Sequence, residues 1–306
     1  MKQLIFYASY LCLPFLVACL FAVARKTGAI RWLAVATTIV TGVIAYSRFI
    51  EPNILQVKHA EIVLEGAIPE SPTIKIALFS DTHFGVYKNA MPMQRIVERI
   101  NRESPDAVMI AGDFLYHLSP IDIPRVLAPL ADLHAPVFAV LGNHDVGFPG
   151  PIYTKELYAA LQALKVNLVE NRATRVNLGE QEVVIAGASD LWERRQDFSF
   201  AADKPNLPLL LLTHNPDTAL SVPDFVDYDL MLAGHTHGGQ IRIPWLFKKV
   251  IPTKHPFDRG LHRLWVEANK RFVYVTPGTG MVGLPLRFNM PPRIDILKVA
   301  LPTPTT

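Results

Sequence analysis

Cysteine is nearly absent from the sequence, since Cys12 and Cys19 are its only two and both lie in its first apolar stretch. After residue 50 there is therefore no disulfide and no thiolate ligand, which excludes a structural zinc site built on cysteines. Acidic residues are also missing from the first 50 positions, because the first one is Glu51.

The basic residues of the N-terminal segment account for the charge of the whole chain. The formal net charge is +3, and residues 1–50 contribute +5 through Lys2, Arg25, Lys26, Arg31 and Arg48. The remaining 25 basic and 27 acidic residues leave the rest of the chain at −2. Such a balance disfavours a general nucleic-acid binder, so no nucleic-acid partner is expected.

Two long apolar runs stand in this N-terminal segment. Leu4–Ala24 and Trp32–Ser47 contain no charged residue, and the second run continues past Arg48 to Ile50. Each is near the length that crosses a hydrocarbon core of ~30 Å. We therefore predict a transmembrane hairpin with helices at about 4–24 and 32–50. A cleaved signal peptide, or a lipoprotein box ending at Cys19, is the alternative, but a second apolar run favours the hairpin.

The turn of the predicted hairpin carries three positive charges in the stretch RKTGAIR. The positive-inside rule places this turn in the cytoplasm. The expected location is a cell (inner) membrane, crossed twice, with the rest of the chain on the periplasmic or exterior side. Lys2 and the terminal amine oppose this orientation.

The rest of the chain predicts an α/β domain. Apolar runs at 74–80, 106–112 and 137–142 alternate with helical patterns at 93–103, 123–133 and 155–165, as in parallel β-α-β units. Later runs have few helical patterns between them and predict a second sheet packed on the first; they lie at 182–188, 207–213, 228–233, 271–276 and 294–299. Residues 51–73, punctuated by prolines, are expected to be a connector. We divide the chain into hairpin and connector (1–57), domain (58–301) and frayed tail (302–306).

Polar side chains with ligand chemistry follow five of these apolar runs. They are Asp81 and His83, Asp113, Asn143 with His144 and Asp145, His214, and finally His235 and His237. The carboxyl ends of strands in open α/β sheets form ligand-binding edges, so we expect these side chains to meet. Carboxylate, imidazole and amide oxygen suit Mn, Fe, Zn or Co. The set is too large for one tetrahedral ion, whereas two ions ~3.5–4 Å apart and bridged by a carboxylate would use it.

This ordered set resembles the motifs of the calcineurin-like metallophosphoesterase superfamily over roughly residues 74–300. The stretches GHTHGGQIRIP and TPGTGMVGLPLRFNMPPRIDIL resemble its membrane-anchored YkuE/YaeI-type branch, although Arg293 stands where that branch usually has glutamate. The resemblance implies a four-layer αββα fold, a two-sheet sandwich flanked by helices. It further implies that Asp81, His83 and His237 hold one metal, and that Asn143, His214 and His235 hold a second. Asp113 would bridge the two ions, with one carboxylate oxygen on each. His144 would contact the substrate phosphate and protonate the leaving oxygen.

The expected function is that of a membrane-anchored dinuclear-metal phosphoesterase. Its substrate would contain a phosphodiester or pyrophosphate bond and would be linked to a lipid or a nucleotide. One alternative is a UDP-2,3-diacylglucosamine pyrophosphatase-like enzyme of lipid A synthesis, whose cytoplasmic substrate conflicts with the orientation above. A non-catalytic metal-binding scaffold is the other alternative.

Several residues outside this set also have polar or aromatic side chains. We expect Asp145 to cap a turn or orient His144, and Trp192 to be a buried anchor rather than a cleft residue. His117 and His134 are expected to be surface or capping residues, and His59 stands in the expected connector without an identifiable partner. Residues 242–263 carry six basic residues and one acidic residue among apolar ones. This segment predicts contact with a lipid surface or a lipid-linked phosphate through Lys248, Lys249 and Lys254; the alternative is a loop packed on the domain with solvated charges.

Overall fold

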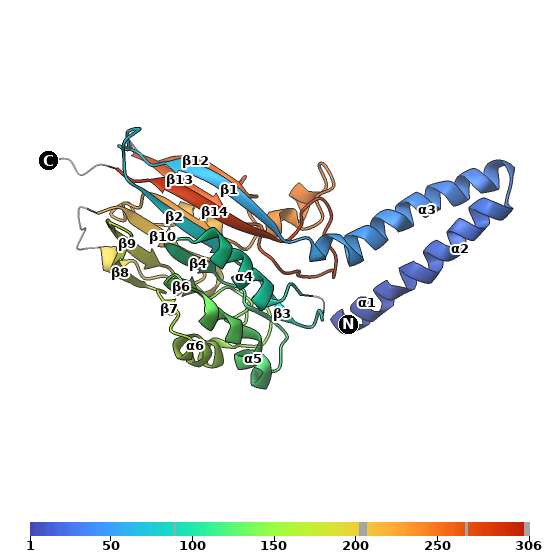
Figure 1. Cartoon of the computed structure of the whole chain (residues 1–306), viewed down its shortest axis with the longest axis horizontal. Coiled ribbons are helices and arrows are strands. Elements are labelled where there is room, and N and C mark those ends of the chain that lie inside the picture. The colour runs from blue at the N-terminus through green and yellow to red at the C-terminus, as the bar shows by residue number, and fades with distance from the viewer. Residues whose placement is uncertain (89, 202–206, 267–268, 303–306) are drawn as a thin grey trace.

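The computed structural model describes residues 1–88, 90–201, 207–266 and 269–302, with backbone alone for 265–266 and 269–270. The predicted tail beyond residue 302 lies outside this range. Figure 1 shows a helical hairpin that projects from one end of a two-sheet domain.

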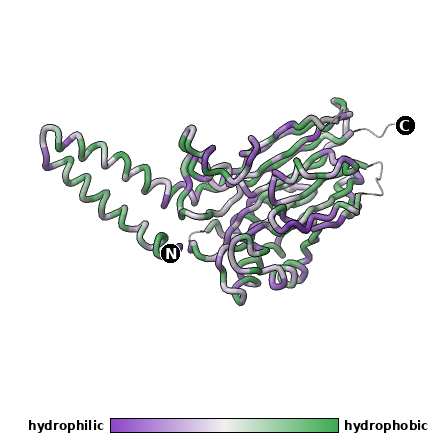
Figure 2. The backbone as a smooth tube through the Cα atoms, turned by 180° about the vertical axis from the view of Figure 1, so that it is seen from behind, coloured by the Kyte–Doolittle hydropathy of each residue, from purple (hydrophilic) through white to green (hydrophobic). Residues whose placement is uncertain are grey.

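The hairpin matches the prediction closely. Its first arm is α1 (Lys2–Ala8), the 3-10 turn η1 (Ser9–Leu11) and α2 (Cys12–Arg25), and its second arm is α3 (Gly28–Phe49) followed by η2 (Glu51–Asn53). The two spans, Lys2–Arg25 and Gly28–Asn53, are long and apolar enough to cross a membrane. Figure 2 shows them mostly in the colours of apolar residues, and 11% and 17% of their apolar windows are buried within the molecule.

The first sheet has six strands in the order β1 (Gln56–Val63), β14 (Arg293–Ala300), β2 (Thr73–Phe79), β4 (Ala107–Ala111), β6 (Val137–Val140) and β7 (Asn167–Leu168). β2, β4, β6 and β7 are parallel, and β14 runs antiparallel to β2. The expectation of a connector over residues 51–73 is wrong for β1, which is an edge strand with only one fully buried residue and hence little apolar signal.

The second sheet also has six strands, in the order β12 (Gly260–Val266), β13 (Asn269–Val275), β11 (Leu230–Ala233), β10 (Leu209–Leu212), β9 (Gln181–Gly187) and β8 (Arg172–Leu178). The four inner strands are parallel, and the edge strands β12 and β8 are antiparallel to their neighbours. Two short strands, β3 (Phe84–Gly85) and β5 (Leu115–Tyr116), form a separate pair.

Three apolar layers hold the domain together. The middle layer packs the two sheets face to face, with residues such as Met109 and Phe138 from one and Leu210 and Leu232 from the other. The first sheet's outer face is covered by α4 (Met93–Glu103), α5 (Ile123–Leu127) and α6 (Thr154–Ala163). Within the described residues, the second sheet's outer face is covered by loops and the 3-10 turns η6 (Ser199–Ala201) and η7 (Pro216–Leu220). The predicted two-sheet sandwich flanked by helices is confirmed.

Local sequence explains the helices. α4 buries Met93, Ile96, Val97 and Ile100, the spacing of one helical face, and it occupies the predicted range. The predicted helix over 123–133 is shorter, because Pro129 cannot donate a backbone hydrogen bond. The α-helix ends at Leu127. The 3-10 turn η3 (Pro120–Asp122) precedes it, and the 3-10 turn η4 (Ala128–Asp132) follows it.

Candidate metal centre and active site

The predicted ligand residues converge at one edge of the sandwich. β2, β4 and β6 of the first sheet and β10 and β11 of the second end there, and the side chains that follow them are buried. Asp81, His83, Asp113, His235 and His237 all adopt positive φ, between 46° and 69°. Such backbone is uncommon for residues other than glycine and gathers at functional sites, where surrounding contacts maintain it.

The first group of ligand atoms consists of Asp81, His83 and His237. His83 Nε2 lies 3.0 Å from His237 Nε2. Asp81 Oδ1 lies 3.3 Å from His237 Nε2 and 3.8 Å from His83 Nε2. Ligand atoms placed ~2.0–2.1 Å from one tetrahedral ion would be about 3.3 Å apart, so this group has the spacing of a coordination shell.

The second group consists of Asn143, His214 and His235. His214 Nε2 lies 3.1 Å from Asn143 Oδ1 and 3.1 Å from His235 Nδ1. His214 Nδ1 lies 2.7 Å from the carbonyl oxygen of Ala111. Donation of the Nδ1 proton to that carbonyl leaves the Nε2 lone pair facing the group, which is the usual way a metal-binding histidine is oriented.

Asp113 stands between the two groups. Its Oδ2 is 3.5 Å from His83 Nε2 and 3.3 Å from His214 Nε2, while its Oδ1 accepts a hydrogen bond of 2.9 Å from the backbone N–H of His144. The expectation that each carboxylate oxygen would serve a different ion is therefore wrong. One oxygen faces both groups, because the other is occupied by the loop after β6.

The electrostatics of the site fit cation binding. Burial lowers the pKa of His83 and His235 to about 3, so both are neutral near pH 7, as ligands must be. Burial would also lower the pKa of His214, but the Asp113 carboxylate outweighs it and raises that pKa well above its usual value. Burial raises the pKa of Asp81 to about 7. Burial would raise the pKa of Asp113 too, but His214 beside it lowers that pKa, so this carboxylate stays ionised and its negative charge attracts a proton to His214. A divalent ion bound by the two groups would replace that proton.

The donor set also passes a test of fit. Asp81 Oδ1 is buried and has no hydrogen-bond donor among the described residues. Buried polar atoms without partners are uncommon and call for an explanation. The two groups offer imidazole, carboxylate and amide oxygen ligands, which suit Mn, Fe, Zn or Co. The residues present therefore fit divalent metal binding.

His144 lies beside the groups without joining either. Its ring centroid is 5.2 Å from that of His83, and its Nδ1 lies 2.9 Å from the carbonyl oxygen of Pro149. Asp145, in contrast, is fully buried and accepts backbone hydrogen bonds of 3.0–3.1 Å from Gly142, Phe114 and Leu115. It ties the loop after β6 to that after β4, whereas the expected roles were to cap the segment that follows it or to orient His144.

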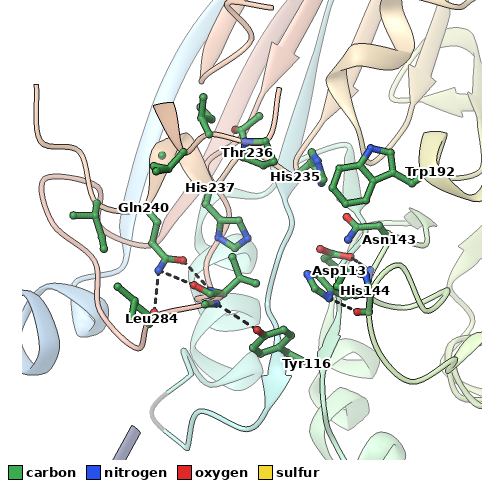
Figure 3. Close-up of a pocket in the computed structure, with 18 of the residues that line it drawn as sticks. Asp113, Tyr116, Asn143, His144, Trp192, His235, Thr236, His237, Gln240 and Leu284 are labelled. Carbon is green, nitrogen blue, oxygen red and sulfur yellow. Dashed lines mark hydrogen bonds between the residues drawn. The ribbon is translucent and has the colours of Figure 1, made fainter. Parts of the chain in front are cut away.

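A cavity of about 530 Å³ opens in front of the metal-ligand groups. In Figure 3, Trp192, His235 and Asn143 lie at one end of it, and Gln240 and Leu284 lie at the other. Trp192 is 41% exposed and its ring stands edge-on to that of His235, 4.8 Å between centroids. The prediction of a buried anchor is wrong, because this tryptophan lines the cleft.

The structure adds residues that sequence reasoning missed. Lys2 and Tyr116 line the same cavity as Asp113 and His144. His117, expected to be an isolated surface residue, lies with its Nε2 2.8 Å from Lys2 Nζ. Nothing in the sequence spacing links position 2 to position 117, so only the docking of the hairpin brings them together.

The basic segment divides into two parts. Lys248 and Lys249 are exposed in the 3-10 turn η9 (Phe247–Lys249). Lys254 instead lines a neighbouring cavity, with its backbone N–H donating to Asp217 Oδ2 at 3.1 Å. Arg293, the departure from the related sequences, is mostly buried and pairs with Asp295 at 2.9 Å. It lies outside the residues that line the metal-site cavity.

Comparison with known proteins agrees with this geometry. The chain is 30% identical to phosphodiesterase YaeI of Escherichia coli, with 87% of this chain and 96% of that protein aligned. It is 28% identical to the metallophosphoesterase YkuE of Bacillus subtilis, over 86% and 92% of the two chains. A bovine transmembrane protein with a metallophosphoesterase domain is 28% identical, over 90% of this chain and 63% of that one. The family model for calcineurin-like phosphoesterases matches residues 74–239, which include the seven predicted metal-ligand positions, and the chain belongs to that family.

Proposed function

We propose that this protein is a membrane-anchored phosphoesterase with two divalent metal ions, and that it hydrolyses a phosphodiester or pyrophosphate bond. The position of Asp113 Oδ2, within 3.5 Å of a ligand nitrogen from each group, carries the proposal. A carboxylate oxygen between two clusters of ligand atoms is the arrangement of a two-metal site.

The roles of the protein's own residues follow from where they lie. Bound cations would supply a water of lowered pKa and offset the negative charge that builds on phosphorus. His144 lines the cavity, and its Nδ1 hydrogen bond to Pro149 leaves Nε2 as the nitrogen available for proton transfer to the leaving oxygen. Trp192 and apolar residues such as Leu284 line the same cavity as His144.

Membrane anchoring is supported by the two apolar spans, which expose most of their surface outside the domain. The relatives named as transmembrane proteins agree with it. The basic turn at Arg25 and Lys26 favours a cytoplasmic turn and an exterior or periplasmic catalytic domain in a cell (inner) membrane. A reporter at the C-terminus that is active only outside the cytoplasm should be active, and an inactive reporter would reverse this orientation.

A second contact with the bilayer is proposed for residues 243–250. Trp245 is 86% exposed and Val250 is 67% exposed, and Lys248 and Lys249 stand between them. Next to this segment, the Arg242 backbone N–H donates to the Phe288 carbonyl. The neighbouring Arg287 backbone N–H donates to the carbonyl of Ser47, near the end of α3. Exposed apolar residues with basic neighbours favour an anionic lipid surface.

The central test is hydrolysis of bis(p-nitrophenyl) phosphate by the full chain with Mn²⁺. Asp113→Ala should abolish hydrolysis because it removes the carboxylate between the two groups. His214→Ala should abolish it because it removes a ligand of the second group. His134→Ala, an exposed histidine away from the site, is the matched control and should retain full activity. Activity in the Asp113→Ala protein would refute the two-metal assignment.

Substrate class is tested separately. A panel of phosphomonoesters, phosphodiesters, pyrophosphates and UDP-linked lipids would be assayed with several metals. Selective cleavage of UDP-2,3-diacylglucosamine would identify the lipid A alternative. Metal binding without turnover on any member of the panel would favour the non-catalytic scaffold.

A further inference from the structure

The membrane hairpin is docked on the catalytic domain rather than merely joined to it. Phe6 of α1 is buried, and its ring stacks on that of Tyr87 with 5.9 Å between centroids. Arg48 of α3 lies 4.5 Å from the Phe6 ring and donates to Ser9 Oγ at 2.7 Å, so it fastens the two arms together. The domain holds α3 in turn, through a hydrogen bond of 2.9 Å from the Arg287 backbone N–H to the Ser47 carbonyl.

This docking brings Lys2 to the catalytic cavity. Its Nζ lies 2.8 Å from His117 Nε2 and 4.0 Å from the centroid of the Tyr116 ring. The Tyr116 ring is in turn 5.1 Å from the ring of His144. A lysine near a membrane interface usually extends into water or headgroups. Lys2 instead lines the cavity that contains Asp113 and His144.

Another part of the cavity wall is apolar and is formed by Ile241, Val250, Ile251, Pro252, Val282 and Leu284. Val250 is 67% exposed and Leu284 is 44% exposed, although they belong to a cavity that ends at buried charged residues. In Figure 1 the N-terminus and the end of α3 both lie at one end of the domain. The lining of this one cavity thus combines the ligand atoms, a cation supplied by the hairpin and apolar side chains.

We propose that Lys2 is a substrate-binding residue supplied by the membrane hairpin, and that the cavity accepts an amphiphilic phosphate ester. Lys2 attracts the negative charge of the phosphate group, and the acyl or alkyl chain lies along the wall that contains Val250 and Leu284. The substrate would then enter from the bilayer surface. This inference rests on the proposed phosphoesterase function and specifies its substrate class.

The experiment compares two chromogenic phosphodiesters with the same leaving group, p-nitrophenyl ethyl phosphate and p-nitrophenyl hexadecyl phosphate. Full-length protein in detergent micelles with Mn²⁺ is assayed as wild type, Lys2→Gln, Lys2→Arg, Leu284→Asn and Lys26→Gln. Lys26 lies at the far turn of the hairpin and provides the matched control. Both KM and kcat are measured for each pair.

The wild type should have the lower KM for the hexadecyl ester. Lys2→Gln should raise KM for both esters about tenfold, the scale of a lost charge-assisted hydrogen bond, with kcat nearly unchanged. Lys2→Arg should restore KM, and Lys26→Gln should match the wild type. Leu284→Asn should raise KM for the hexadecyl ester and leave that for the ethyl ester as it was.

The outcomes separate this inference from the function on which it rests. A wild type that cleaves neither ester defeats the phosphoesterase proposal and the inference together. Cleavage of the ethyl ester with an unchanged KM in Lys2→Gln overturns the role of Lys2 alone. Equal effects of Leu284→Asn on both esters, or no preference of the wild type for the longer chain, overturn the amphiphilic substrate.

Discussion

His144 separates chemistry from metal binding at the residue scale, because its side chain lines the cavity while its ring nitrogens lie outside both ligand groups. We predict that His144→Ala lowers kcat by about 10²–10⁴, the usual contribution of a general acid. The bound metal, measured by mass spectrometry of the purified protein, should stay at the wild-type level. Loss of metal in His144→Ala would instead make this histidine a ligand.

Asp190 gives a prediction about pH. Burial raises the pKa of its carboxyl from 3.8 to about 6. Because the folded value is the higher one, this group's stabilising contribution is complete below pH 4 and is lost as pH rises through 6. Asp190→Asn lacks the charge and keeps the oxygen that accepts the Trp192 N–H at 2.9 Å. After chelation, Asp190→Asn should be more stable than the wild type at pH 7.5 by up to about 3 kcal/mol.

Denaturant unfolding of the full chain, followed by tryptophan fluorescence at pH 4 and pH 7.5, measures this difference. It should fall below about 1 kcal/mol at pH 4, where the wild-type carboxyl is protonated in the folded state and only about half ionised in the unfolded state. A difference of the same size at both pH values would show that packing, and not the charge, distinguishes the two proteins.

The sequence alone predicts that these seven side chains meet, because each follows an apolar run and parallel strands end at a common edge. Spacing could not reveal which oxygen of Asp113 faces the two groups, since the hydrogen bond from His144 decides it. Trp192 was misjudged for a related reason. A large aromatic residue that follows a strand is on average buried. Only the contact between the rings of Trp192 and His235 in the folded protein shows that this tryptophan lies at the cleft.

At the scale of elements, the loops after β4 and β6 must approach closely for the ligand groups to form. A Cβ atom on Gly142 would lie 2.2 Å from Asp113 Oδ1 and 2.5 Å from Asp113 N. We predict that Gly142→Ala forces these loops apart, lowers the free energy of unfolding by about 1–3 kcal/mol and abolishes metal binding. Gly42→Ala in α3 is the control, because nothing lies within 4 Å of its Cβ.

Metal content and denaturant unfolding of the two alanine variants would be compared side by side. Gly42→Ala should bind metal as the wild type does and be equally stable or slightly more stable. A Gly142→Ala protein that retains its metal would mean that the two loops tolerate a wider separation than the ligand distances suggest.

A helix or strand can be predicted from the sequence when its buried apolar residues recur at the spacing of that element. α4 has a full apolar face and was predicted over its observed range. The edge strands β1 and β8 were missed, since β1 buries one residue completely and β8 exposes five of seven. Their membership in the sheets comes from pairing with β14 and β9, which a single sequence does not record.

For the whole molecule, the sequence predicts a hairpin and a sandwich but not their arrangement. The contacts that fix it join distant positions through aromatic stacking and backbone hydrogen bonds, as in Phe6 with Tyr87 and Arg287 with Ser47. Those residues carry no pattern that marks them as partners. Through these contacts Lys2 of the hairpin reaches the cavity that holds the predicted metal ligands.

This arrangement predicts that residues 243–250 touch the bilayer. The wild-type chain and the variants Trp245→Phe and Trp192→Phe would be reconstituted in nanodiscs with and without brominated phosphatidylcholine, which quenches tryptophan fluorescence in the acyl region. Trp245→Phe should lose part of the lipid-dependent quenching, because Trp245 is 86% exposed in the segment next to the hairpin. Trp192→Phe should keep it, since Trp192 lines the metal-site cavity. If the wild type and Trp245→Phe lose the same amount of fluorescence to brominated lipid, Trp245 does not reach the acyl region. The segment then lies in water, and the hairpin alone holds the domain at the membrane.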